Sequence, residues 1–446
     1  MIVRAAIGFI TASAVGIPGF VVTTIEGPTL MILELVPGTD IGAIIDDFGL
    51  TLLDSIESHD LYLVAVPAAL AAQEMGGFEA AQEMGGLDAD PRIEEAEVDD
   101  DATAPQAADG DTQPIFFYVP SGEFDGQFAL SLDDIAGAHA SSTGTGVVVA
   151  VLDTGADIDH ELLAGRIAPG GYDFVDDDTD VAEQAIGLDV DGDGVQDELH
   201  GHGTFVAGIV ATVAPSASIL PIRVLDSEGY ADVFRVVQGI YHAIDNDADI
   251  INLSLGTKSH NHILRNAVAD AAYAGIIVVT AVGDDDREHP VQMPAGEEAT
   301  IAVAATDYDD VKSDFSNFGG HVSLTSPGQE VVSSMPDGAY ARASGTSIST
   351  AFVAGTVALM RSADPTLTQI QIENLLYLTA HEIDSLNPGL EGLLGAGRLD
   401  VAAAVAEAVP TGPGPSLIDV LGPGMPAAVN GRDLLIFLGI DWRQAE

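Results

Sequence analysis

Cysteine is absent from the 446-residue sequence, and only 14 lysine and arginine residues stand against 70 aspartate and glutamate residues. Without cysteine the chain forms no disulfides and has no thiol chemistry. The formal net charge of −56 repels nucleic acid and anionic membranes, so neither is an expected partner. Such acidity, with Lys258 and Lys312 as the only lysines, indicates adaptation to high salt or to abundant divalent cations.

Apolar residues make up 47% of the chain, enough for a large core and more than one domain. Between residues 114 and 409, continuous apolar runs alternate with segments of helical periodicity, and such runs are typical of strands buried on both faces of a parallel sheet. The predicted strands are 147–152, 219–225, 249–255, 276–282 and 300–305, and the predicted helices are 233–246 and 262–274. We therefore expect an α/β domain with a doubly wound parallel sheet, whose active site lies beyond the carboxyl ends of the strands.

Three polar residues stand at the ends of apolar elements in this domain. Asp153 ends a predicted strand, His202 opens an apolar helix, and Ser347 begins the almost uncharged helix 348–361. Taken singly, each has an ordinary structural explanation as a turn former, a buried histidine or an N-cap. An acid, a base and a hydroxyl together form the constellation that nucleophilic acyl transfer requires.

The flanking motifs Asp153-Thr-Gly, His202-Gly-Thr and Gly-Thr-Ser347, in that order, resemble the subtilisin family of serine proteases over about residues 129–406. The resemblance implies a monomeric serine endopeptidase that forms an acyl-enzyme on Ser347, with His202 transferring the proton and Asp153 orienting the imidazole. Its protein or peptide substrates would be held by main-chain hydrogen bonds to the edge segments 225–231 and 254–256. The implied substrate-binding residues are Leu225, Gly229, Ser254, Leu255, Gly256 and Pro294.

One position departs from the family pattern. Where the family usually has an asparagine that donates to the oxyanion, this chain has Asp284. An ionised carboxylate only accepts hydrogen bonds and would repel the oxyanion, whereas a protonated Asp284 could donate. Activity then needs the acid form of Asp284 together with the neutral form of His202. The alternative is a subtilisin fold that binds peptides with weak or no catalysis.

A second motif is the acidic loop 189–198, just before His202. Its carboxylates are spaced as in the short loops that wrap Ca²⁺, and Gly194 allows the sharp turn. The twelfth position, a bidentate glutamate in an EF-hand, is His200, so the loop looks more like the shorter calcium loops. A solvated acidic loop is the alternative. The predicted ligands of a structural Ca²⁺ are Asp189, Asp191, Asp193 and either Asp197 or Glu198.

Two segments precede the linker that leads to the α/β domain. Residues 1–22 are apolar with Arg4 near their start, which is typical of a secretory signal, with a membrane anchor or a buried segment as alternatives. We therefore expect secretion or a cell-envelope location. Residues 28–67 are predicted to form a small α+β unit with a helix at 40–48. By resemblance this unit is an inhibitory propeptide, the chain's own partner; a domain without catalytic consequence is the alternative.

The remaining segments are predicted from composition. Residues 71–113 contain a nine-residue tandem copy followed by an acidic run, and we expect a disordered linker in which maturation cleavage occurs. Residues 410–426 form a linker rich in proline and glycine. Residues 427–446 resemble half of a degenerate dockerin repeat, with an amphipathic capping helix as the alternative.

Overall fold

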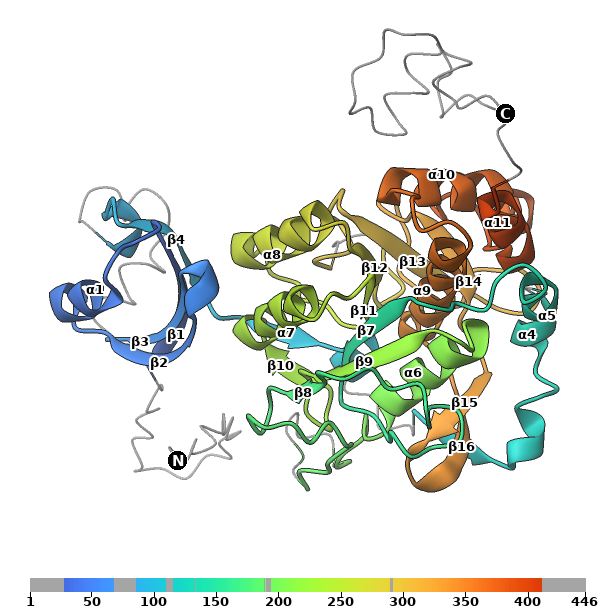
Figure 1. Ribbon diagram of the computed structural model, residues 1–446, viewed down its shortest axis with the longest axis horizontal. Helices are drawn as coiled ribbons and strands as arrows, with labels where there is room; N and C mark the ends of the chain where they lie inside the picture. The colour runs from blue at the N-terminus through green and yellow to red at the C-terminus, as the bar shows by residue number, and fades with distance from the viewer. Residues whose placement is uncertain are drawn as a thin grey trace, which may run out of the picture. The chain divides into compact units, whose positions relative to one another are not determined.

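The computed structural model describes residues 28–67, 86–109, 115–132, 134–187, 189, 194–288 and 292–410 (Figure 1). The chain forms two compact units, which meet in sequence between Asp99 and Asp100. The predicted signal segment 1–22 and the predicted tail 427–446 lie outside the described residues, as does nearly all of the linker 410–426.

The first unit is a four-stranded antiparallel sheet with one helix, in the strand order β2-β3-β1-β4. Its elements are β1 (Thr29–Leu35), α1 (Ile41–Phe48), β2 (Thr51–Ile56), η1 (Glu57–His59), β3 (Leu61–Val66), η2 (Leu87–Ala89) and β4 (Ile93–Val98). Asp40 caps α1 by accepting from the Gly42 N–H, and Ile44 joins Leu33 and Val64 in the core. The strands and the helix predicted for residues 28–67 are present.

The strand β4 lies inside the segment 71–113, for which the sequence predicts a disordered linker. For the described residues 86–109 that prediction is wrong, because β4 pairs antiparallel with β1 and the chain continues into a further strand, β5 (Asp101–Thr103). Leu87 and Ile93 bury their side chains in the core of the first unit. Pairing with a strand more than fifty residues earlier supplies backbone hydrogen bonds that an acidic composition does not reveal.

The second unit is built on a seven-stranded, entirely parallel sheet in the order β14-β13-β12-β11-β7-β9-β8. Its strands are β7 (Val148–Asp153), β8 (Tyr172–Asp173), β9 (Ser218–Arg223), β11 (Ile250–Leu253), β12 (Ile277–Ala281), β13 (Thr300–Thr306) and β14 (Leu324–Pro327). Its main helices are α6 (His202–Val213), α7 (Val233–Asp245), α8 (His262–Tyr273) and α9 (Thr346–Ala363). Figure 1 shows α7 and α8 on one face and α6 and α9 on the other, which confirms the doubly wound α/β prediction.

The strand order places a topological switch beside β7. The chain adds β9 on one side of β7 and then crosses to add β11 on the other. Active sites of such sheets lie at the carboxyl ends of the strands next to the switch, and β7 ends at Asp153. The predicted strand 219–225 ends early, at Arg223, because the Val224 and Leu225 N–H groups turn to donate to the Asp153 carbonyl.

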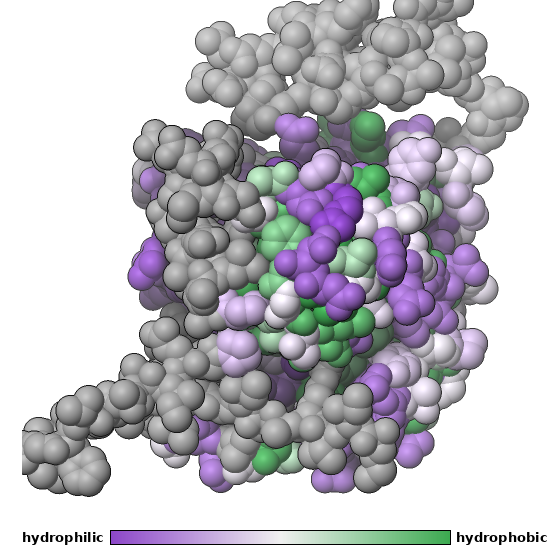
Figure 2. Space-filling view, turned by 90° about the vertical axis from the view of Figure 1, so that its left-hand side faces the viewer, coloured by the Kyte–Doolittle hydropathy of each residue, from purple (hydrophilic) through white to green (hydrophobic). Residues whose placement is uncertain are grey.

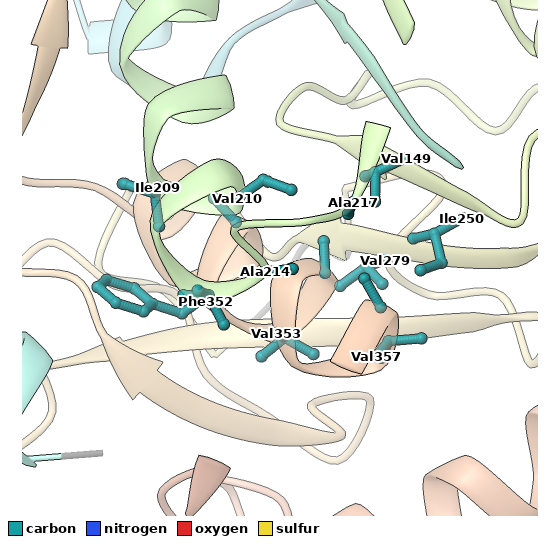
Figure 3. Close-up of a cluster of buried hydrophobic side chains, with 14 of the residues drawn as sticks. Val149, Ile209, Val210, Ala214, Ala217, Ile250, Val279, Phe352, Val353 and Val357 are labelled. Carbon is teal, nitrogen blue, oxygen red and sulfur yellow. The ribbon is translucent and has the colours of Figure 1, made fainter. Parts of the chain in front are cut away.

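The core lies between the sheet and the pair α6 and α9. Val149 and Val279 point from the strands toward Val210 and Val353 on the two helices (Figure 3). Residues 346–360 of α9 are all buried, as its nearly uncharged sequence predicts. On the surface shown in Figure 2, by contrast, hydrophilic and hydrophobic residues are interspersed. Within the described ranges, no helix combines the length and the hydropathy needed to cross a bilayer.

Shorter elements complete the second unit. They are η3 (Pro105–Asp109), β6 (Phe117–Val119), η4 (Ser121–Glu123), α4 (Phe128–Leu132), α5 (Ile135–Ala138), β10 (Tyr230–Asp232), β15 (Val331–Met335), η5 (Pro336–Gly338), β16 (Ala339–Ala343), α10 (Gln369–Thr379), η6 (Asp384–Leu386) and α11 (Val401–Ala408). Among them, β15, β16 and β6 form a small antiparallel sheet, and β10 pairs with β5.

Candidate active site

The last residue of β7 and the first residue of α6 form a buried pair. His202 Nδ1 lies 2.7 Å from Asp153 Oδ1, and the two side chains are 2% and 0% exposed. A carboxylate only accepts hydrogen bonds, so Nδ1 carries the proton and Nε2 keeps its lone pair. His202 Nε2 is buried and has no hydrogen-bond partner among the described residues. The imidazole is therefore oriented as a base.

The charges around His202 favour its protonated form. Burial alone would lower the pKa of His202, but the charge and the hydrogen bond of Asp153 outweigh this effect. The carboxylates of Glu183 and Asp284 act in the same direction, so the pKa of His202 is raised. The uncharged ring of Phe116 also lies near His202, with its centroid 6.5 Å from that of the imidazole.

Ser347 lies in the first turn of α9 and is fully buried. Its hydroxyl donates to Gln106 Oε1 at 3.0 Å and has a longer contact of 3.5 Å with the Ser254 carbonyl. The first backbone N–H groups of a helix have no acceptor within the helix and favour negative charge beside them. The location suits a nucleophile whose substrate becomes an oxyanion, but in this structure the hydroxyl is directed to a glutamine.

That glutamine belongs to a segment of the chain itself, residues 101–107. The strand β5 pairs antiparallel with β10, and on its other side Thr103 exchanges two backbone hydrogen bonds of 2.9 Å with Gly256. The next residue, Ala104, donates its N–H to the Gly229 carbonyl at 2.9 Å. Residues 101–104 thus lie as an extra strand between the two edge segments that the sequence analysis assigns to substrate binding, and Gln106 follows in η3.

The predicted substrate-binding residues fall into three groups. Gly229 and Gly256 bond the extra strand through their backbones, and the Ser254 hydroxyl donates to the Ser347 carbonyl at 3.2 Å. Leu225 and Leu255 are 0% and 1% exposed core residues. Pro294 follows a cis peptide bond, and its carbonyl accepts from the Thr300 hydroxyl. Of the two predicted edge strands, residues 230–232 form β10, whereas 254–256 contributes one isolated bridge at Gly256.

Asp284 joins the loop after β12 to the start of α9. Its Oδ1 accepts from the Thr346 N–H at 3.0 Å and from the Thr346 hydroxyl at 2.7 Å, and the residue is 7% exposed. Its Oδ2 lies toward Gly345, 3.0 Å from the position that a Cβ would take there. The Asp284 side chain thus accepts two hydrogen bonds from the first residue of α9.

The acidic loop before α6 is described only in part, since Asp191 and Asp193 lie outside the described residues. Asp189 Oδ2 accepts from the Gly194 N–H at 3.1 Å, and Gly194 has a φ of 98°, as the predicted sharp turn requires. Asp197 Oδ1 accepts from the Ile186 N–H, the Gly187 N–H and the Ser227 hydroxyl. These donors engage the Asp197 carboxylate, and the choice between Asp197 and Glu198 as a calcium ligand stays a prediction.

Two residues at this site were missed by the sequence analysis. Gln106 bonds the Ser347 hydroxyl, and Glu183 accepts from backbone N–H groups at the start of α6. Both lie outside the strands and helices with recognisable patterns, and neither belongs to a motif. Each residue has its role because the folded chain places it beside the first turn of a helix, so no local signal in the sequence identifies it.

Comparisons with known proteins agree with this geometry. The model of the subtilase family matches residues 144–397. The chain is 39% identical over 231 residues to an intracellular serine protease of Paenibacillus polymyxa, covering 49% of this chain and 67% of the relative. It is 39% identical over 243 residues to thermitase of Thermoactinomyces vulgaris, covering 52% and 81%.

Solved structures give the same result. The crystal structure of a cold adapted subtilisin-like serine proteinase matches with 31% identity and a TM-score of 0.51, over 58% of this chain and 89% of that one. A protease structure from Pseudoalteromonas arctica matches with 30% identity and a TM-score of 0.59, over 64% and 98%.

Proposed function

The chain belongs to the subtilase family of serine peptidases, and on that basis we propose that it is an endopeptidase with Ser347 as nucleophile, His202 as general base and Asp153 as the acid that orients the base. The observation that carries the proposal is the buried 2.7 Å bond between His202 Nδ1 and Asp153. It leaves Nε2 as a buried acceptor without a partner among the described residues, which is the state that a general base needs.

The proposed reaction has two halves. Ser347 Oγ attacks the carbonyl carbon of the peptide while its proton passes to His202 Nε2, and the carbonyl π electrons move onto oxygen. When the tetrahedral intermediate collapses, the C–N bond breaks and the leaving amine takes the proton from Nε2. Water then gives a proton to Nε2 and attacks the ester, which releases the carboxylic acid and returns the hydroxyl to Ser347.

Two donors are proposed for the oxyanion. One is the Ser347 backbone N–H in the first turn of α9, and the other is the protonated carboxyl group of Asp284. The second donor exists only when Asp284 is protonated, whereas the base works only when His202 is neutral. Since the pKa of His202 is raised, the two requirements oppose each other, and we expect a narrow bell-shaped pH profile with a low maximum.

The same chain is proposed to be a self-inhibited precursor. Residues 101–107 take up the main-chain hydrogen bonds that a substrate would form with Gly229 and Gly256. Ser347 is fully buried beneath them, and its hydroxyl is bonded to Gln106. Cleavage within residues 71–113 would separate the first unit from the peptidase and allow this segment to leave.

Calcium, export and a monomeric state complete the proposal. The hard oxygen ligands that Ca²⁺ prefers would come from Asp189, Asp191, Asp193 and either Asp197 or Glu198. The turn at Gly194 fits a loop that wraps an ion. The ion would stiffen the loop that leads into α6. The signal-like composition of residues 1–22 supports secretion or a cell-envelope location, although one relative is named an intracellular protease.

The test is peptidase activity of the purified chain with calcium, from about pH 4 to about pH 9, beside Ser347→Ala and Asp284→Asn. Cleavage that Ser347→Ala abolishes and Asp284→Asn accelerates at neutral pH would support the proposal. If neither the wild type nor Asp284→Asn cleaves, although the protein is folded and residues 1–113 have been removed, a peptide-binding protein on the subtilisin fold becomes the better description.

A further inference from the structure

The first turn of α6 has an unusual set of hydrogen-bond acceptors. Its N-cap residue is Gly201, which has no side chain to cap the helix. The N–H groups of the next residues find acceptors elsewhere: His202 donates to the Leu199 carbonyl at 3.0 Å, and Gly203 donates to the Thr154 hydroxyl at 2.9 Å. Every first-turn donor must find such a partner, because none exists within the helix.

Glu183 supplies the remaining acceptors from a loop eighteen residues before the helix. Its Oε1 accepts from the Thr204 N–H at 2.9 Å and from the Thr204 hydroxyl at 3.0 Å. Its Oε2 accepts from the Gly201 N–H at 3.1 Å. One carboxylate therefore bonds the residues on both sides of His202 and fixes the turn that carries the imidazole.

The charge of Glu183 matters as much as its hydrogen bonds. His202 is the first residue of α6, where the positive end of the helix dipole disfavours an imidazolium ion. Burial disfavours it too. Three carboxylates oppose these effects, from the end of β7 (Asp153), the loop before α6 (Glu183) and the loop after β12 (Asp284). Of the three, Glu183 is bonded directly to the N–H groups at the positive end of the dipole.

We propose that Glu183 is a positioning residue for His202, which caps α6 from a distant loop and stabilises the imidazolium that forms during each proton transfer. This inference rests on the proposed peptidase function. If Glu183 were only a structural cap, its replacement would change only the stability of α6. If its charge acts on His202, replacement also changes the pH at which the base works.

The test compares the wild type with Glu183→Gln, which keeps the shape and one acceptor but removes the charge. We expect kcat to fall about fivefold, equivalent to about 1 kcal/mol, with KM unchanged because Glu183 does not bond the substrate-binding segments. The limb of the pH profile that His202 sets should move to lower pH. If that limb did not move, the proposal would fail, even if the variant had a lower Tm.

A second measurement does not depend on turnover. In the Ser347→Ala background, NMR titration of the histidine ring signals with and without Glu183→Gln reports the pKa of His202 directly. A lower pKa in the double variant supports the proposal, and the same pKa in both overturns it, whether or not the chain proves to be a peptidase. If Glu183→Gln does not fold, Glu183→Asp, whose shorter side chain withdraws the carboxylate from Thr204, must lower the same pKa.

The matched control is Asp400→Asn. Asp400 is also a carboxylate that caps a helix, since it accepts from the Ala403 N–H at 2.9 Å at the start of α11. Its replacement removes a helix-capping charge, together with the ion pair to His381, and should leave the His202 titration unchanged. If Asp400→Asn moved the pKa of His202 as far as Glu183→Gln does, the effect would reflect net charge alone and the proposal would fail.

Discussion

The helices α6 and α9 begin in the same way, but charges of opposite sign develop beside their first turns during the proposed reaction. Each has a glycine at its N-cap, each carries a proposed catalytic residue in its first turn, and each has a carboxylate bonded to its first N–H groups. At α6 the carboxylate is Glu183, and the charge that develops nearby is the positive imidazolium. At α9 it is Asp284, and the charge that develops nearby is the negative oxyanion. The same local chemistry therefore assists one catalytic group and opposes the other.

The largest expected effect comes from removing the nucleophile at α9. Ser347→Ala keeps the bonds between Asp284 and Thr346, so the fold should not change. In subtilisin itself, loss of the nucleophile costs about 2 × 10⁶ in kcat, and loss of an oxyanion-hole donor about 10²–10³. If Asp284 already removes most of the oxyanion-hole contribution from the wild-type kcat, Ser347→Ala should lower kcat by about 10³–10⁴ in this chain.

This loss is measured as initial rates of peptide hydrolysis. Ser362→Ala, in the last turn of the same helix, is the control, because its hydroxyl bonds only the Thr145 carbonyl and its rate should equal that of the wild type. Residual activity in Ser347→Ala above about a tenth of wild type would exclude Ser347 as the nucleophile.

The second prediction removes the opposing charge at α9. Asp284→Asn offers a neutral amide donor in place of a carboxylate, so we expect kcat at neutral pH to rise by about 10², and the profile to lose its fall toward higher pH. The measurement is kcat from about pH 4 to about pH 9. Asp285→Asn, one residue along, removes a buried carboxylate that is paired with the half-exposed Lys258; it is the control and should leave the profile as it is. A slower Asp284→Asn enzyme would show that the ionised carboxylate is not what limits turnover.

The third prediction concerns the segment that covers α9 in the uncut chain. Gln106→Ala removes the acceptor that holds the Ser347 hydroxyl and leaves the hydroxyl available to His202. A single hydrogen bond contributes about 0.5–1.5 kcal/mol, so we expect the intact chain to disappear up to about tenfold faster. Denaturing gels over time give this rate. Thr103→Ala, which keeps the two backbone bonds to Gly256, should process at the wild-type rate, and equal rates for the two variants would contradict a role for Gln106.

The comparison also shows what the sequence can and cannot reveal. The places of Asp153, His202 and Ser347 at the ends of β7, α6 and α9 were predictable, because each ends or begins a long apolar element. Parallel strands bring such ends to one edge of the sheet. The carboxylate partners of the two helices were harder to foresee. Asp284 was recognised only as a departure from a motif, and its bonds to Thr346 depend on the folded loop.

Glu183 and β5 could not be predicted at all, for a related reason. Glu183 lies in a loop whose acidic neighbours look alike in the sequence, and only the fold shows which one reaches α6. The strand β5 is three residues long, and its order comes from β10 on one side and Gly256 on the other. Composition suggested disorder because it reports the average hydrophobicity and charge of a segment, and not the strands with which the segment pairs in the folded chain.

The smallest effect is expected at a carboxyl group that lies inside a helix and does not bond the N–H groups at a helix start. Glu373 lies within α10, where burial raises its pKa to about 7 although the Gln369 amide donates to it. The folded chain therefore holds a proton that the unfolded chain has lost, so stability is greatest below the unfolded value of 4.5 and falls as pH rises toward 7. Glu373→Gln should abolish this fall. Because the side chain is partly exposed, we expect the free energy of unfolding of Glu373→Gln to exceed that of the wild type by only about 1 kcal/mol at pH 8, or about 2–4 °C in Tm. At pH 4 we expect no difference. Calorimetry at the two pH values checks the difference, and an equal change at both would mean that burial does not raise the pKa of Glu373.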